Sequence, residues 1–177
     1  MSEKIGQKKL ALLFCMLFIT IYNMKLLMDS DCLIKITKAG LKECMVQHFH
    51  ITLPKIVEVE VVDSGMVKNL PDAIIVRENI KQKKLHVDLA KKYFKNGDEA
   101  VCELYDHNKF KAVATDDAKL IKFLHSLNIP YIVPAALLYS LFKHKKITKQ
   151  KCLEFLNKLK PFINIDEYSS VRILLEV

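Results

Sequence analysis

Short apolar runs alternate with longer segments of helical spacing along most of the chain. The apolar runs predict β-strands, and the segments with an apolar residue every three or four positions predict helices. The strand runs lie at residues 25–28, 51–53, 85–87, 111–115 and 129–133. The helical segments lie at residues 32–37, 41–47, 54–62, 71–80, 98–107, 116–127, 135–142, 148–159 and 166–175. Pro54 and Pro71 suit the first turn of a helix, while Thr148 and Asp166 are the expected caps of the last two helices.

Strands separated by helices predict a parallel sheet, because parallel neighbours must be joined by a crossover connection. We expect an α/β fold with three α/β/α layers around a central parallel sheet of about four strands. A length of 177 residues suits one compact domain, and the sequence has no internal repeat or long linker. The pattern therefore predicts one domain over residues 24–177, preceded by an apolar extension over residues 1–23.

The N-terminal extension has an apolar run from Leu10 to Ile21 behind Lys8 and Lys9, which imitates the start of a secretory signal. No small-residue cleavage site follows the run. The run is also shorter than the ~20 residues that a helix needs to span a bilayer. A membrane anchor is therefore the disfavoured interpretation. The favoured interpretations are an extra buried helix and a start that lies upstream of the natural one.

Composition indicates a globular protein with a polyanionic partner. A hydrophobic content of 51% with only 4 glycines and 5 prolines excludes disordered and collagen-like classes. The 5 cysteines form no Cys-x-x-Cys pair, which favours reduced thiols and a cytoplasmic location. A formal charge of +8 favours nucleic acid, although a generally lysine-rich surface explains it equally well. Because only Arg77 and Arg172 are arginines, we expect contact with the phosphate backbone rather than reading of base edges.

Acidic residues directly follow two of the predicted strands. Asp29 comes after the first strand run, and Asp116 and Asp117 come after the fourth. In an open α/β sheet, ligands bind beyond the carboxyl ends of the strands, so these acids converge if the two strands are neighbours. Glu99, in the first turn of the preceding helix, is placed to join them. Because close carboxylates repel, such a site recruits Mg²⁺ or Mn²⁺, which can activate water and engage phosphate oxygens.

Helix capping is the alternative explanation of these acids. Asp favours the N-cap position, and the helix dipole favours acids in the first turn. Capping accounts for any one of them taken singly. Their coincidence at the ends of two strands favours a shared site over a set of unrelated caps.

Four blocks of the sequence resemble the motifs of PIN-domain nucleases. Residues 27–34, an apolar strand followed by Asp, small or polar residues and Leu-Ile, resemble the family's opening motif. Residues 54–61, with Pro, Val and Glu at intervals of three, are similar to its next helix. Residues 97–101 resemble its Gly-Glu helix start, and residues 115–117 resemble its Thr-x-Asp or Asp-Asp element. The spacing of all the blocks agrees, and the helices over residues 147–176 look like one branch of the family.

The resemblance covers about residues 24–177 and implies a metal-dependent endoribonuclease that uses Mg²⁺ or Mn²⁺. It implies that the four acids already noted are metal ligands and catalytic residues: Asp29, Glu99, Asp116 and Asp117. It gives accessory roles to neighbouring acids and a serine: Glu60, Asp31, Ser30 and Asp98. Asp98 competes with Glu99, because the family's helix start often has one more residue than this chain. For Glu60, surface pairing with a nearby lysine is an equally good explanation.

Three classes of function stay open on the sequence. The favoured class is a ribonuclease, either a VapC-type toxin held inactive by an antitoxin protein or an enzyme of RNA maturation. Small single-domain members of the family are often such toxins, and members often form homodimers. The second class is a non-catalytic module that binds nucleic acid or protein and keeps the fold. The third is a phosphate-handling, receiver-like α/β protein, which would accept a phosphoryl group at one Asp.

Overall fold

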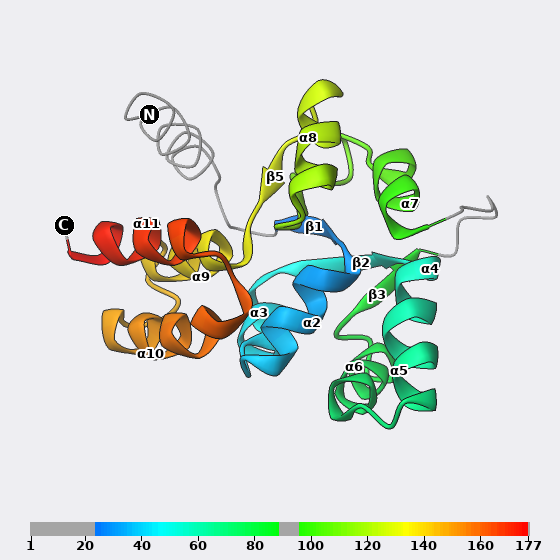
Figure 1. The fold of residues 1–177 in the computed structure, drawn as a ribbon, viewed down its shortest axis with the longest axis horizontal. Coiled ribbons are helices and arrows are strands. Elements are labelled where there is room, and N and C mark those ends of the chain that lie inside the picture. Colours follow the sequence, from blue (N-terminus) through cyan, green and yellow to red (C-terminus); the bar gives the residue numbers. More distant parts are fainter. Residues whose placement is uncertain (1–23, 89–95, 177) are drawn as a thin grey trace.

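The computed structural model describes residues 24–88 and 96–176, and within them a parallel sheet of five strands forms the centre (Figure 1). The strands are β1 (Lys25–Met28), β2 (His50–Pro54), β3 (His86–Asp88), β4 (Ala112–Ala114) and β5 (Tyr131–Ile132). Their order in the sheet is β3-β2-β1-β4-β5, and every adjacent pair is parallel. The α/β prediction is confirmed, but the sheet has five strands rather than about four, because both short edge strands pair.

The described part of the chain connects these strands through helices that begin close to their predicted positions. The helices are α2 (Ser30–Lys38), α3 (Lys42–His48), α4 (Lys55–Glu58), α5 (Ser64–Val67), α6 (Pro71–Lys81), α7 (Gly97–Leu104), α8 (Ala118–Ser126), α9 (Pro134–Lys143), α10 (Lys149–Leu159) and α11 (Ile165–Glu176). A π-helical segment, η1 (Val59–Asp63), joins α4 to α5, and a short 3₁₀ segment, η2 (Lys160–Phe162), follows α10.

The alternation of side chains along β1 divides the core between the two faces of the sheet. Leu26 and Met28 point into the larger core, which α2, α3, α9, α10 and α11 cover. Leu27 points to the other face and packs in a smaller core with Val101 of α7 and Leu120 of α8. Because successive side chains of a strand point to opposite faces, a fully apolar strand is buried on both sides. The predicted α/β/α layers are therefore present.

The helical segment after β2 is longer than predicted and contains one irregular turn. The sequence suggests an end near residue 62, whereas α4, η1 and α5 continue to Val67. Gly65 lets α5 approach α6, because a methyl group in its place would lie 2.6 Å from Cβ of Ala73. Two other helix ends also differ from the prediction. Helix α7 ends at Leu104 rather than near residue 107, and Asn164 rather than Asp166 caps α11, its side chain accepting a hydrogen bond from Glu167 N at 2.8 Å.

The apolar run of residues 10–21, and with it the extension predicted over residues 1–23, lies outside the described residues. None of the helices in the described part is both long and apolar enough to cross a membrane.

Candidate acidic site

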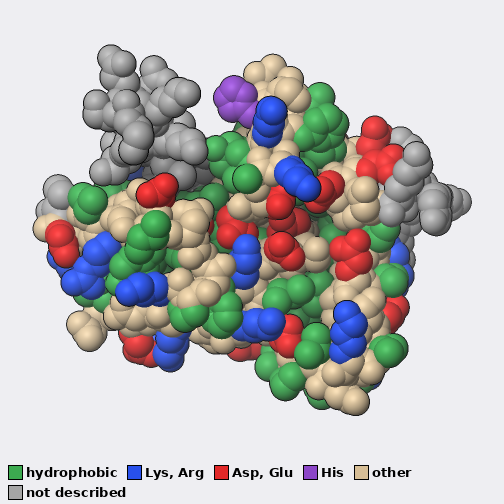
Figure 2. All heavy atoms as spheres, viewed as in Figure 1, with side chains coloured by type: hydrophobic (Ala, Val, Ile, Leu, Met, Phe, Trp, Pro, Cys, Tyr) green, Lys and Arg blue, Asp and Glu red, His purple; other side chains and the backbone are tan. Residues whose placement is uncertain are grey.

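The carboxyl ends of β1 and β4 lie side by side in the middle of the sheet. The two strands pair in register, with Met28 opposite Ala114. The backbone N–H of Asp29 then donates to the carbonyl of Ala114 at 3.2 Å. Asp29 and the acids that follow β4 therefore emerge at the same edge of the sheet, as the sequence predicts. Figure 2 shows Asp and Glu side chains gathered in the middle of this face of the molecule, below α8.

Asp29 is a buried carboxylate, with only 5% of its surface exposed. Its Oδ1 accepts a hydrogen bond from Cys32 N at 2.7 Å, which caps α2, and its Oδ2 accepts one from the hydroxyl of Thr115. Burial raises the pKa of Asp29 to about 7, in spite of these two hydrogen bonds, which favour the charged form. The charges of Asp116 and Asp31 raise it further. Asp29 thus changes charge near neutral pH.

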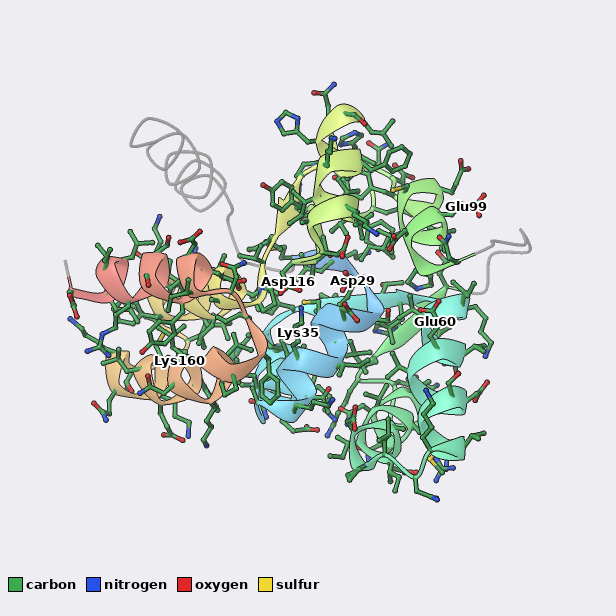
Figure 3. The ribbon with its side chains drawn as sticks, viewed as in Figure 1. Asp29, Lys35, Glu60, Glu99, Asp116 and Lys160 are labelled. Carbon is green, nitrogen blue, oxygen red and sulfur yellow. The ribbon has the colours of Figure 1, made fainter. Side chains whose placement is uncertain are left out.

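Asp116 is held by Lys35 of α2 (Figure 3). The Lys35 ammonium donates to both carboxylate oxygens at 2.7 Å, and the Asp116 side chain is only 5% exposed. Burial alone would lower the Lys35 pKa, but the hydrogen bond and the charge of Asp116 raise it above its ordinary value. The ammonium is therefore a resident positive charge among the acids of this site.

Two more acids of the site, Asp117 and Asp98, come from the starts of helices α8 and α7. Oδ1 of Asp117 caps α8 by accepting from Lys119 N at 2.8 Å and from Leu120 N at 2.7 Å. Asp98 lies in the first turn of α7, where burial and then the charges of Asp117 and Asp31 raise its pKa. Asp29 and Asp117 thus cap helices, as the capping explanation of these acids predicts. Both residues nonetheless lie among other acids. Capping and a shared site are compatible here.

Glu99 and Glu60 are placed further from the pair of Asp29 and Asp116. The backbone of Glu99 is held by Asn96, whose Oδ1 accepts from Glu99 N at 2.9 Å, and the side chain is exposed. Figure 3 draws it on α7, apart from Asp29. Glu60 projects from η1 toward the start of α7, because a methyl group on Gly97 would lie 3.1 Å from its Oε2.

The two accessory residues next to Asp29 lie at the start of α2. Ser30 is the first residue of this helix and is half-buried. Asp31 is exposed in the first turn, and its charge acts on both Asp29 and Asp98. The negative charge of Asp31 therefore acts both on the acid that follows β1 and on the acid at the start of α7.

Three residues of this site are absent from the set predicted from the sequence: Lys35, Thr115 and Glu167. Thr115 is fully buried between Asp29 and Asp117, and its place in the Thr-Asp-Asp element is a signal that the sequence carries. Lys35 lies 81 positions from its partner Asp116, and no local pattern links them. Glu167 comes from α11 and is 3% exposed. Its pKa is raised to about 7 by burial, raised further by Asp116 and lowered by Lys35.

The donor atoms at this edge are carboxylate oxygens, which suit a hard cation such as Mg²⁺ or Mn²⁺ better than zinc. The buried Asp29, with Asp116 beside it, fits such an ion, because a cation would favour the charged form that burial opposes. Within residues 24–88 and 96–176, no three His, Cys, Asp or Glu side chains are arranged as a ready metal group. The Lys35 ammonium lies on both oxygens of Asp116, where its charge would oppose a metal ion at this carboxylate.

These features define a parallel α/β protein with an acidic site at the carboxyl edge of its sheet. A family model described as a PIN domain matches residues 25–176, and the chain therefore belongs to the PIN-domain family. The resemblance seen in the sequence is confirmed. PIN domains are generally nucleases, and PIN nucleases generally use divalent metal ions. A search of curated proteins gives no significant match.

Proposed function

We propose that the chain is an endoribonuclease that hydrolyses RNA phosphodiester bonds with Mg²⁺ or Mn²⁺ at this acidic site. The observation that carries the proposal is the buried carboxylate of Asp29 beside Asp116, at the paired ends of β1 and β4. A buried acid with like charges around it costs stability, and a bound cation offsets that cost. Membership of a family of nucleases supports the same chemistry.

Asp29 and Asp116 would hold the cation, with Asp117 and Asp98 or Glu99 completing the acidic set. Once bound, the metal supplies Lewis-acid polarisation of a phosphate and a water of lowered pKa. Thr115 fixes the orientation of the Asp29 carboxylate through its hydroxyl hydrogen bond. The pKa of about 7 belongs to Asp29 without a metal ion, and a bound cation would keep this carboxylate charged at neutral pH.

RNA is the proposed substrate, and contact with its backbone is expected to come from lysines. The formal charge of +8 supports a polyanionic ligand, which counterion release and Coulomb attraction would favour. Lys119 and Lys122 are exposed on α8, and the charge of Lys119 acts on Asp98 of the acidic site. The four cysteines of the described residues are thiols, which supports the proposed cytoplasmic location.

Cleavage of a mixed RNA pool tests the proposal. Purified full-length protein is incubated with Mg²⁺, Mn²⁺ or a chelator, beside Asp29→Asn prepared in the same way. We expect metal-dependent cutting that is lost in the variant, because the amide cannot supply the negative charge. Equal cutting by both proteins would point to a contaminant, and cutting by neither would remove the nuclease proposal.

A second candidate, a non-catalytic module that binds nucleic acid, is favoured by one observation. Lys35 neutralises Asp116, which leaves fewer acids ready for a metal. Binding of RNA that is unchanged by chelator, together with an absence of cutting, would support this candidate over the ribonuclease.

The proposed biological role is that of a toxin restrained by an antitoxin protein. An enzyme of RNA maturation is the alternative role. Induced expression in a host cell distinguishes the two, because a toxin should arrest growth and Asp29→Asn should not. Recovery on co-expression of a neighbouring gene product would identify the antitoxin. Light scattering of the purified chain tests the proposed homodimer.

A further inference from the structure

Glu167 is a buried carboxylate whose two oxygens differ in their partners. Oε1 accepts a hydrogen bond from the backbone N–H of Ala135, at 2.7 Å, near the start of α9. Oε2 is buried, and no hydrogen-bond donor of the described residues reaches it. A buried carboxylate oxygen without a donor is costly, and such groups are uncommon in folded proteins. Glu167 therefore calls for a role beyond the cap of α9.

Lys35 is the cation that acts on Glu167. The Glu167 carboxyl group lies close enough to Lys35 and Asp116 to respond to both charges. The Lys35 ammonium now donates to both oxygens of Asp116. The charge of this one ammonium therefore acts on two carboxylates, and it is hydrogen-bonded to Asp116.

A divalent cation at the Asp116 carboxylate would compete with the Lys35 ammonium, which now donates to both of its oxygens. Each oxygen keeps a further lone pair, but a cation bound to the same carboxylate as the ammonium would be repelled by it, and this repulsion is strong in a partly buried site. Lysine has a flexible stem, which lets its ammonium move while its backbone stays in α2. A displaced ammonium with only 24% of the side chain exposed still needs a nearby counter-charge.

We propose that Lys35 changes partner when the site binds a divalent cation, moving from Asp116 to the unpartnered Oε2 of Glu167 and so opening Asp116 to the metal. The exchange rests on the metal site of the proposed function and adds a regulation to it. Without metal, Lys35 suppresses the repulsion between Asp116 and Asp29. With metal, Glu167 keeps the lysine charge paired, and Glu167 is thus a positioning residue that sets the affinity for the cation.

Mn²⁺ titration of the full-length protein, followed by electron paramagnetic resonance of the unbound ion, tests this exchange. The proteins are the wild type, Lys35→Met, Glu167→Gln and the double variant. The Gln side chain keeps an oxygen for Ala135 N–H and removes the charge. We expect Lys35→Met to tighten Mn²⁺ binding about tenfold, because the competing ammonium is gone. We expect Glu167→Gln to weaken it about tenfold, because the displaced ammonium then has no partner.

The double variant separates the exchange from simple charge effects. If Lys35 changes partner, Glu167→Gln should alter the Kd by less than about twofold once Lys35 is Met. Equal effects of Glu167→Gln in both backgrounds, or no effect of Lys35→Met, would overturn the exchange. Glu154→Gln, which alters an exposed acid of α10, is the matched control and should leave the Kd unchanged. Should Glu167→Gln fold poorly, Glu167→Met removes the same charge.

Failure of the exchange can be told apart from failure of the proposed function. Mn²⁺ binding that needs Asp29 but ignores Lys35 would overturn the exchange alone. The expected Lys35 and Glu167 effects without any RNA cutting would overturn the nuclease and leave the exchange in place. Absence of Mn²⁺ binding in both the wild type and Lys35→Met would overturn both.

Discussion

The hydroxyl of Thr115 donates a hydrogen bond to Oδ2 of Asp29 and so ties together the ends of two adjacent strands. The same hydroxyl oxygen accepts from the backbone N–H of Asp117 at 3.1 Å. Thr115 is fully buried, so water does not compete for either hydrogen bond. One side chain therefore fixes the acid after β1 relative to the chain that enters α8.

Thr115→Val should destabilise the protein and shift the titration of Asp29. The valine leaves the Asp29 oxygen and the Asp117 N–H without their partner, which costs about 1–3 kcal/mol for a buried group. Because the Thr115 hydrogen bond lowers the Asp29 pKa, its loss should raise that pKa further. Urea unfolding and the pH profile of RNA cleavage measure the two effects. Thr115→Ser keeps the hydroxyl, and its pH profile of cleavage should stay close to that of the wild type. An equal shift of the pH profile in Thr115→Val and Thr115→Ser would argue against a role of the hydroxyl hydrogen bond.

Stability should fall as the pH rises from about 4 to 7 in the presence of a chelator. Burial raises the pKa values of Asp29 and Glu167 to about 7 each. In that window the native state therefore holds protons that the unfolded chain has released, and stability decreases with pH under this condition. Thermal unfolding between pH 4 and pH 8 checks the direction. A wild type that becomes steadily more stable from pH 4 to pH 7 would contradict it.

Asp29→Asn isolates the part of this pH dependence that belongs to Asp29. The amide oxygen can still accept from Cys32 N, and no charge is buried at high pH. At pH 8 we expect the variant to be more stable than the wild type, by on the order of 2–4 kcal/mol. Adding Mn²⁺ should stabilise the wild type more than the variant. Equal stability of both proteins at pH 8 would mean that the buried Asp29 carboxylate costs the fold little.

The acids at the strand ends could be predicted because they depend on local pattern. The strand that ends at Met28 leads directly into Asp29, and the apolar strand that ends at Ala114 leads through Thr115 into Asp116. Their pairing follows from the general arrangement of open α/β sheets. The runs that form the edge strands β3 and β5 are predicted as strands, but both are short, and the expected sheet holds about four strands rather than all five.

Lys35 and Glu167 could not be predicted in the same way. In the sequence, Lys35 has the spacing of a solvent-facing lysine on α2, and Glu167 has that of an acid favoured by the helix dipole in a first turn. Their contact with the site depends on how α2, α9 and α11 pack over the same face of the sheet. Such packing brings together residues from distant parts of the chain, and the local sequence pattern around each residue does not show these contacts.

Asp98→Asn should impair cleavage more than Glu99→Gln. The two residues are consecutive, and a helix turns by about 100° per residue, so only one of them can face the site. Asn96 fixes the start of α7, and the charges of Asp117 and Asp31 act on Asp98. We expect kcat/KM to fall by about tenfold or more for Asp98→Asn and by less than about threefold for Glu99→Gln. The reverse order would return Glu99 to the role that the resemblance gives it.

Gly65→Ala should destabilise the protein without touching the acidic site. The added methyl group would lie 2.6 Å from Cβ of Ala73, closer than two carbon atoms can pack. Either α5 or α6 must shift, which costs about 1–3 kcal/mol for overpacking. Urea unfolding measures the loss, and Mn²⁺ affinity should stay unchanged. Ala73→Gly in the same chain should recover part of the lost stability, and a failure to do so would place the strain elsewhere.

Asp117 allows capping to be separated from a role of its charge. Its Oδ1 accepts from two backbone N–H groups at the start of α8, and Asn caps helices about as well as Asp. The free energy of unfolding of Asp117→Asn should therefore lie within about 0.5 kcal/mol of the wild-type value, whereas that of Asp117→Ala should be lower by about 1 kcal/mol. If the Asp117 charge contributes to metal binding, both variants should weaken Mn²⁺ binding to a similar extent. Normal Mn²⁺ affinity in Asp117→Asn with reduced affinity in Asp117→Ala would instead assign Asp117 to the helix alone, and the acidic site would then rest on Asp29, Asp116 and Asp98.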